Sequence, residues 1–272
     1  QGSVFQVPCA HELGRLRNDA AVALCMEPHR ADSLYGRLGE IEPQRPDARL
    51  GQLRARLRQR DPQAALQMTE ELWQSASLSA NDSTTVARWQ GDAHWLEGNH
   101  TAAESLYTMA LQGAASRVTR RALQVSLAIL QDEDLRPLLR DYLIESNQND
   151  TTSLTLLATA RSRQPQSLWP RYLLGRRLYY AHRFDEAIVE FQHVQQQFAD
   201  AGVPEDVRLA TVELLAWSYL RSGNAASARD LAEAALGLQA SSRWASAGTL
   251  SWSEAERLRL EDLRRRAAAR LR

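Results

Sequence analysis

Residues 167–198 read SLWPRYLLGRRLYYAHRFDEAIVEFQHVQQQF, and the helical pattern of the chain is clearest in this stretch. Its apolar residues recur at steps of three and four in Leu174–Leu178 and again in Phe184–Val194, which is the period of an amphipathic helix. The polar residues 182–183 separate the two runs. The stretch therefore predicts two amphipathic helices joined by a tight turn.

The same design occurs elsewhere in the chain. Residues 213–238 read ELLAWSYLRSGNAASARDLAEAALGL, with a turn at Ser222-Gly223-Asn224, and a further copy covers residues 84–112. Small and aromatic residues take the same relative places in the copies. They are Gly91, Ala103 and Tyr107 in one copy and Gly175, Ala187 and Phe191 in another. The small residues let the two helices of a pair approach closely.

These pairs resemble the tetratricopeptide repeat, a family of helical repeat proteins. The matching residues are Leu174-Gly175, Leu178, Ala187 and Phe191 in one pair, and Leu215-Ala216, Tyr219 and Ala228 in the next. Arg171 departs from the family pattern, since it stands at the tryptophan position, and the spacing of about forty residues exceeds the usual period of about 34. The resemblance implies an all-α fold, a right-handed α-solenoid of stacked antiparallel helix pairs with a terminal capping helix.

The chain divides into three parts on this interpretation. Residues 1–3 resemble the remnant of an expression tag, residues 4–45 are expected to form an irregular helical cap, and residues 46–272 are expected to form the solenoid. The clearest pairs are 84–112, 168–199 and 207–237, and a C-terminal helix is expected at 251–270. Helices are also expected at 118–131, 134–145 and 152–163. Three helices do not fit a strict alternation of pairs, so either one is wrong or the solenoid has an irregular unit there.

Charge and composition argue against several classes of partner. The 33 basic residues, all arginine, balance 33 acidic ones, so no global field attracts nucleic acid. No apolar run approaches the roughly 18–20 residues needed to span a bilayer, so no membrane span is expected. The exclusive use of arginine favours a bacterial source with GC-rich coding. The compartment stays open, with a periplasmic or outer-membrane-associated location favoured over the cytoplasm.

The chain has two cysteines, Cys9 and Cys25. A short helical hairpin would bring them together, and a disulfide would then suit an oxidising compartment. The alternative is two separate buried thiols. No second cysteine or histidine lies at ligand spacing near either, so no metal site is expected. Phosphate-binding glycine loops, nucleophile elbows and His-Glu-x-x-His motifs are also missing from the sequence, so we expect neither a catalytic centre nor a cofactor in this segment.

The best candidate for a binding site is the inner groove of the solenoid. In proteins of the resembled family, ligand contacts come from the groove-facing side of each pair's first helix. The matching positions here are Arg88, Asp92, Trp95, Trp169, Tyr172, Arg176, Tyr179, Tyr180, Glu213, Trp217 and Arg221. Tryptophan, tyrosine and arginine are enriched at binding hot spots. The alternative is that several of these aromatics pack between repeats, and Tyr179 and Tyr180 cannot both face the same way.

Three functions follow as hypotheses. The first is a non-catalytic scaffold that binds a peptide or partner protein in the groove, and a groove filled by the chain's own C-terminal helix would count against it. The second is a bacterial envelope scaffold that assists exopolysaccharide export or binds glycan, with Trp169, Tyr172 and Trp217 stacking on sugar rings. The third is a docking or regulatory domain of a larger protein.

Overall fold

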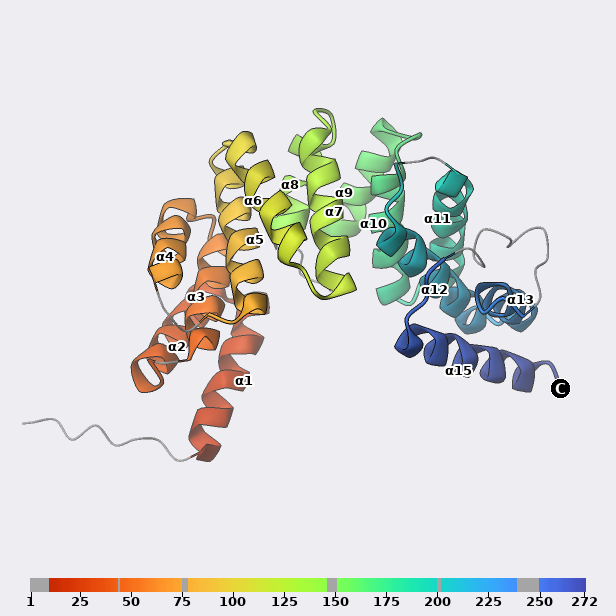
Figure 1. Ribbon diagram of the computed structural model, residues 1–272, viewed down its shortest axis with the longest axis horizontal. Helices are drawn as coiled ribbons and strands as arrows, with labels where there is room; N and C mark the ends of the chain where they lie inside the picture. Colours follow the sequence, from red (N-terminus) through yellow and green to blue (C-terminus); the bar gives the residue numbers. More distant parts are fainter. Residues whose placement is uncertain (1–9, 44, 75–77, 146–150, 200–201, 239–249) are drawn as a thin grey trace, which may run out of the picture. The chain divides into compact units, whose positions relative to one another are not determined.

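The computed structural model describes residues 10–43, 45–74, 78–145, 151–199, 202–238 and 250–272 (Figure 1). The chain forms two compact units, Gln1–Asn147 and Gln148–Arg272. Every regular element in the described ranges is helical. The first unit contains α1 Ala10–Met26, α2 Pro28–Ile41, α3 Pro46–Arg58, α4 Pro62–Gln74, α5 Ala80–Leu96, α6 His100–Gly113, α7 Arg117–Gln131 and α8 Arg136–Glu145. The second contains α9 Thr151–Arg163, α10 Leu168–Tyr180, α11 Phe184–Gln196, the short 3-10 helix η1 Gln197–Ala199, α12 Glu205–Arg221, α13 Ala225–Ala235 and α15 Glu254–Arg270.

Consecutive helices within each unit pack against one another. The helices of each predicted pair, α5 with α6, α10 with α11 and α12 with α13, pack together, and each pair also packs on the helix that follows it. This arrangement confirms the predicted all-α solenoid of stacked helix pairs. The predicted boundary between a cap at 4–45 and a solenoid at 46–272 stays a prediction, since α1 and α2 pack on each other and onward against α3.

Glycine at the centre of two of the clear pairs, α5–α6 and α10–α11, explains the close approach of the two helices in each. A Cβ atom added to Gly91 would lie 2.7 Å from Cε1 of Tyr107. The same atom on Gly175 would lie 2.9 Å from Cε1 of Phe191. Both rings are fully buried. The aromatic ring of the second helix therefore fills the space that the missing side chain leaves on the first.

The start of α5 corrects one expectation from sequence. The sequence predicts the helix pair from residue 84, yet its first helix begins at Ala80, within a polar stretch. Ser79 accepts a hydrogen bond from the backbone N–H of Asp82, whose carboxylate accepts one from the Ser79 N–H, which is a capping box. The polar residues thus begin the helix because they satisfy its first free N–H groups.

The irregular unit lies at α8. The three expected helices form at α7, α8 and α9, so none of them was wrong. The end of the first unit, Asn147, falls between α8 and α9. α8 packs on α7 and also contacts α3 and α5, the first helices of the two preceding pairs. Leu139 of α8 and Leu135, which directly precedes the helix, are completely buried. α8 therefore packs on the side of the first unit that is formed by α3 and α5.

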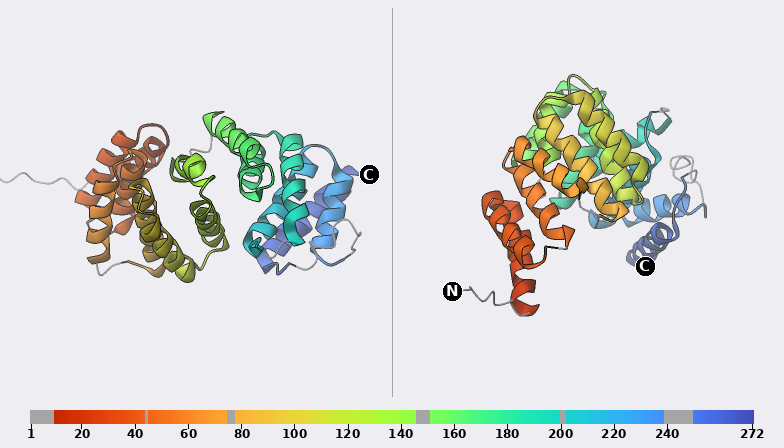
Figure 2. Two further views of the ribbon diagram at one scale, coloured as in Figure 1. Left: turned by 90° about the horizontal axis from the view of Figure 1, so that it is seen from above. Right: turned by 60° about the vertical axis from the view of Figure 1, so that its left-hand side comes forward.

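The second unit ends in the predicted terminal helix. α15 begins with a second capping box, between Ser253 and Glu256. It buries Leu260, Leu263 and Ala267 and lies beside α13 and α12 (Figure 2). The acidic first turn and the arginine in the last turn complement the helix dipole. α15 thus covers the apolar surface of the last helix pair.

Candidate functional site

In the first unit, two of the three predicted groove residues are buried. Trp95 is 1% exposed and Asp92 is 7% exposed. The hydroxyl of Tyr107 donates a hydrogen bond of 2.5 Å to Oδ1 of Asp92, and the rings of Trp95 and Tyr107 meet edge to face. The expected role of Asp92 and Trp95 as partner contacts is therefore corrected: both hold α5 against α6.

The pKa shifts of Asp92 and Tyr107 agree with a structural role for these two residues. Burial raises the pKa of Asp92, and the nearby Arg88 guanidinium opposes that rise. Burial and the Asp92 carboxylate raise the pKa of Tyr107 well above its ordinary value. Arg88, the third predicted residue, is half-buried beside the pair. Because α8 contacts α5 on this unit, the chain's own helix takes up part of the predicted groove there.

In the second unit, α10 divides the predicted residues between core and surface. Tyr172 is completely buried, which corrects its expected role as a ligand contact. The guanidinium of Arg176 lies over the Tyr172 ring, 5.6 Å from its centroid, within cation–π range. Trp169 is half-buried. Arg176 is therefore positioned by the buried ring beneath it.

Tyr179 comes close to two predicted residues of α12. Burial raises the pKa of the Tyr179 hydroxyl, the Arg221 guanidinium opposes the rise, and Tyr180 and Glu213 add to it. The Tyr179 ring also meets Tyr180 and Phe184 edge to face. Tyr179 thus lies near Arg221 and Glu213. Helical spacing puts Arg176 one turn before Tyr179, and it puts Trp217 one turn from both Glu213 and Arg221. We call these five predicted residues the α10–α12 face: Arg176, Tyr179, Glu213, Trp217 and Arg221.

The C-terminal helix contacts one end of the α10–α12 face. Nε of Arg259 lies 2.5 Å and Nη2 lies 3.1 Å from the two carboxylate oxygens of Glu213. The Arg266 guanidinium lies 5.8 Å from the centroid of the Trp217 ring. The hydrogen bond to Glu213 raises the pKa of Arg259. α15 therefore engages Glu213 and Trp217.

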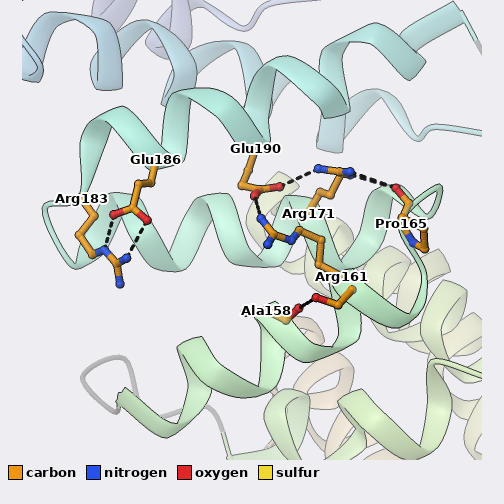
Figure 3. Close-up of polar contacts among 8 residues, drawn as sticks. Ala158, Arg161, Pro165, Arg171, Arg183, Glu186 and Glu190 are labelled. Atoms are coloured by element: carbon orange, nitrogen blue, oxygen red, sulfur yellow. Dashed lines mark hydrogen bonds and ion pairs between the residues drawn. The ribbon is translucent and has the colours of Figure 1, made fainter.

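A buried ion cluster was missed from sequence (Figure 3). Glu190 of α11 is 3% exposed, and its carboxylate accepts hydrogen bonds from Arg161 of α9 at 2.5 Å and from Arg171 of α10 at 3.1 Å. Arg171 also donates from Nε and Nη2 to the carbonyl oxygen of Pro165. This explains why arginine can stand at the tryptophan position of the resembled pattern. The available signal was a carboxylate among the apolar positions of 187–194.

A cavity of about 280 Å³ lies next to this cluster. Leu154 and Ala158 of α9, Leu174 and Leu178 of α10, and Val189 of α11 line its apolar part. Arg161, Arg183, Glu186 and Glu190 supply its polar edge. Figure 3 shows the Arg183–Glu186 pair and the Glu190 cluster at separate places along α11. The second unit thus carries two distinct surface features, the α10–α12 face and this cavity.

The described part of the chain contains no candidate metal-ligand group and no candidate membrane-spanning helix. No group of three histidine, cysteine, aspartate or glutamate side chains there is placed to hold a metal ion. None of its helices combines the length and the apolar character that crossing a membrane requires. Cys25 is exposed near the end of α1, whereas Cys9 lies outside the described residues, so the Cys9–Cys25 disulfide stays a prediction.

Comparisons with known proteins return little. No model of a known protein family matches the chain. No curated protein matches its sequence. Among solved structures, it is similar to the complex of the TPR2AB domain of yeast Sti1 with pHSP90, at 12% identity over 95% of this chain and 99% of that chain, with a TM-score of 0.37. The helix pairing described above follows from the chain's own contacts and does not depend on this likeness.

Proposed function

We propose that the chain is a non-catalytic interaction module that binds a partner protein or peptide through the α10–α12 face. One observation carries the proposal. Tyr179 of α10 lies near Arg221 of α12, Arg176 stands one helical turn before Tyr179, and none of the three belongs to the buried core. Arginine and tyrosine are residues that dominate binding energy in protein interfaces. The buried Tyr172 ring beneath Arg176 restrains that side chain, which lowers the entropic cost of binding.

The charge of this surface indicates the chemistry of the partner. The α10–α12 face carries two arginines, Arg176 and Arg221, and one carboxylate, Glu213, which is already paired with Arg259 of α15. Arg266 of α15 is paired with Asp262 of the same helix. Guanidinium groups bind carboxylates in a planar, bidentate geometry. The surface therefore suits a partner segment that carries aspartate or glutamate. Its steering effect should weaken as salt is added.

A protein partner is better supported than a glycan. Sugar stacking requires an aromatic ring with an open face. Of the three aromatics expected to stack on sugars, Tyr172 is buried, and Trp217 has Arg266 over its ring. Trp169, the third of them, has no group described over its ring, but it is half-buried. The exopolysaccharide role and the envelope location stay hypotheses.

Affinity capture from a lysate of the source organism tests the proposal. The wild-type chain is compared with the double variant Arg176→Glu/Tyr179→Ala and with Arg257→Glu as a matched charge-reversal control. Arg257 is exposed on α15, two residues and therefore about 200° around the helix from Arg259. We expect a protein captured by wild type and by Arg257→Glu but lost by the double variant. Equal capture by all three folded proteins would contradict the proposal.

A further inference from the structure

We infer that the cavity between α9 and α11 is a second binding site, which takes an apolar side chain of a partner segment together with a carboxylate next to that side chain. The inference rests on the proposed function only in that the chain binds proteins. It places an additional contact away from the α10–α12 face. Three features of the cavity lead to it: an apolar lining with an exposed residue, an excess positive charge, and arginine donors without a described partner.

The most buried residues that line the cavity include two leucines of α10. Leu174 is 5% exposed and Leu178 is 4% exposed, whereas Val189 is 50% exposed. Val189 is therefore an apolar side chain left in water at the cavity's edge. Burial of such surface is the main source of affinity in protein contacts. The volume of about 280 Å³ lies just below the range of about 300–1,000 Å³ typical of small-molecule sites, so it suits one or two side chains.

The ion cluster at the cavity carries one excess positive charge. Glu190 has two arginine partners, so Arg161, Arg171 and Glu190 together sum to a single positive charge. Arg171 directs Nη1 to Glu190 and both Nε and Nη2 to Pro165, so all three of its nitrogens are engaged. The side chain of Arg171 is 17% exposed, against 38% for Arg161. The excess charge is therefore most accessible at Arg161.

Arg161 retains hydrogen-bond donors. Within the described residues, its guanidinium contacts only Oε1 of Glu190, through Nη1. Its Nε and Nη2 can donate to a further acceptor, and a carboxylate also neutralises the excess charge. The other pair at the cavity carries no excess charge, because Arg183 is neutralised by Glu186, whose two carboxylate oxygens accept its hydrogen bonds at 2.6 and 2.7 Å. The carboxylate of the partner is therefore expected at the Arg161 end.

A displayed library of random twelve-residue peptides provides the test. Selection on the wild-type chain should enrich sequences with a Leu, Ile, Phe or Met within four residues of an Asp or Glu. One enriched peptide, labelled with fluorescein, is then titrated by fluorescence polarisation. Val189→Asp places a repelling charge at the cavity, and Arg161→Gln removes the excess charge. We expect each change to weaken binding by about tenfold or more, the scale of a lost hot-spot contact.

Matched variants separate this inference from the proposed function. Val118→Asp makes the same substitution at another exposed valine, in the first unit, and should leave affinity unchanged. Arg176→Glu/Tyr179→Ala should also leave it unchanged. If the double variant no longer bound the enriched peptide while Val189→Asp still bound it fully, the inference would be overturned and the proposed function would stand. Failure to enrich any such sequence would also overturn the inference. So would an NMR titration in which octanoate shifts the Val189 signals but no peptide does.

Discussion

The guanidinium of Arg259 forks onto the carboxylate of Glu213, joining the C-terminal helix to α12. Both residues are partly exposed, and Glu213 is one of the positions expected to line a binding groove. The chain's last helix therefore takes up one end of the predicted surface. It leaves Arg176, Tyr179 and Arg221 as the part of the α10–α12 face that a partner can reach without displacing α15.

Removing the Glu213 carboxylate should cost little stability. The change Glu213→Gln keeps the size of the side chain and removes its charge. Since Arg259 is 49% exposed, water screens the pair, and we expect the free energy of unfolding to fall by less than about 1 kcal/mol. Urea denaturation measures this change. A loss several times larger would show that the docking of α15 depends on this pair and not on Leu260 and Leu263.

Adding one methyl group at Gly175 should destabilise the second unit. Its Cβ would meet the Phe191 ring, which is buried and cannot move aside freely. We expect Gly175→Ala to lower the free energy of unfolding by about 1–3 kcal/mol, as overpacking does. Adding Phe191→Leu should recover part of the loss. Gly39→Ala is the control, since a Cβ there has no neighbour within 4 Å, and it should stabilise α2 by about 0.5–1 kcal/mol.

Loss of the buried carboxylate at Glu190 should be costly. Glu190→Ala leaves Arg161 and Arg171 side by side without their anion. We expect a loss of about 2–4 kcal/mol, below the largest values for buried pairs because Arg161 reaches water. Glu186→Ala, on the same helix, breaks an exposed pair with Arg183 and should cost less than about 1 kcal/mol. Equal effects of the two changes in thermal denaturation would contradict the structural role of Glu190.

Acid should weaken the packing of α8 through His100. Nη1 of Arg136 donates to Nδ1 of His100 at 2.8 Å, which needs the neutral imidazole. Burial lowers the pKa of His100 below 6.5, and Arg136 and Arg140 lower it further. The unfolded chain then binds the proton more readily, so this contribution to stability is complete above the unfolded pKa of about 6.5 and is lost as the pH falls below it.

The variant His100→Gln isolates that contribution. Glutamine can accept the same hydrogen bond and does not titrate. Urea denaturation at pH 7.5 and at pH 5.5 should show a larger loss of stability on acidification for the wild-type chain than for His100→Gln. The same loss in both proteins would assign the pH dependence to other groups.

The helix pairs could be predicted because their signal is local. The apolar period and the glycine-aromatic pattern at Gly91 with Tyr107 and Gly175 with Phe191 are properties of single helices and of their nearest partner. The beginning of α5 was missed because polar residues such as Ser79 and Asp82 occur both in loops and in capping boxes.

The candidate site could be predicted only in part. Each helix of a solenoid packs on the helices before and after it, so an aromatic residue at a nominal groove position can be drawn into the core. Trp95 and Tyr172 are such residues. The folding back of α8 depends on contacts with α3, which is distant in sequence. The partners of Glu190 come from two other helices, so the spacing along α11 could not reveal them.

Photo-crosslinking can show whether a partner protein binds at the α10–α12 face. A benzophenone amino acid is introduced at Arg221, an exposed position of that face, and separately at Arg257, which is exposed on α15 and directed away from Arg259. The purified chain is irradiated with the partner captured from lysate. We expect a cross-linked product at position 221 and none at position 257. A product at 257 without one at 221 would contradict the proposed function.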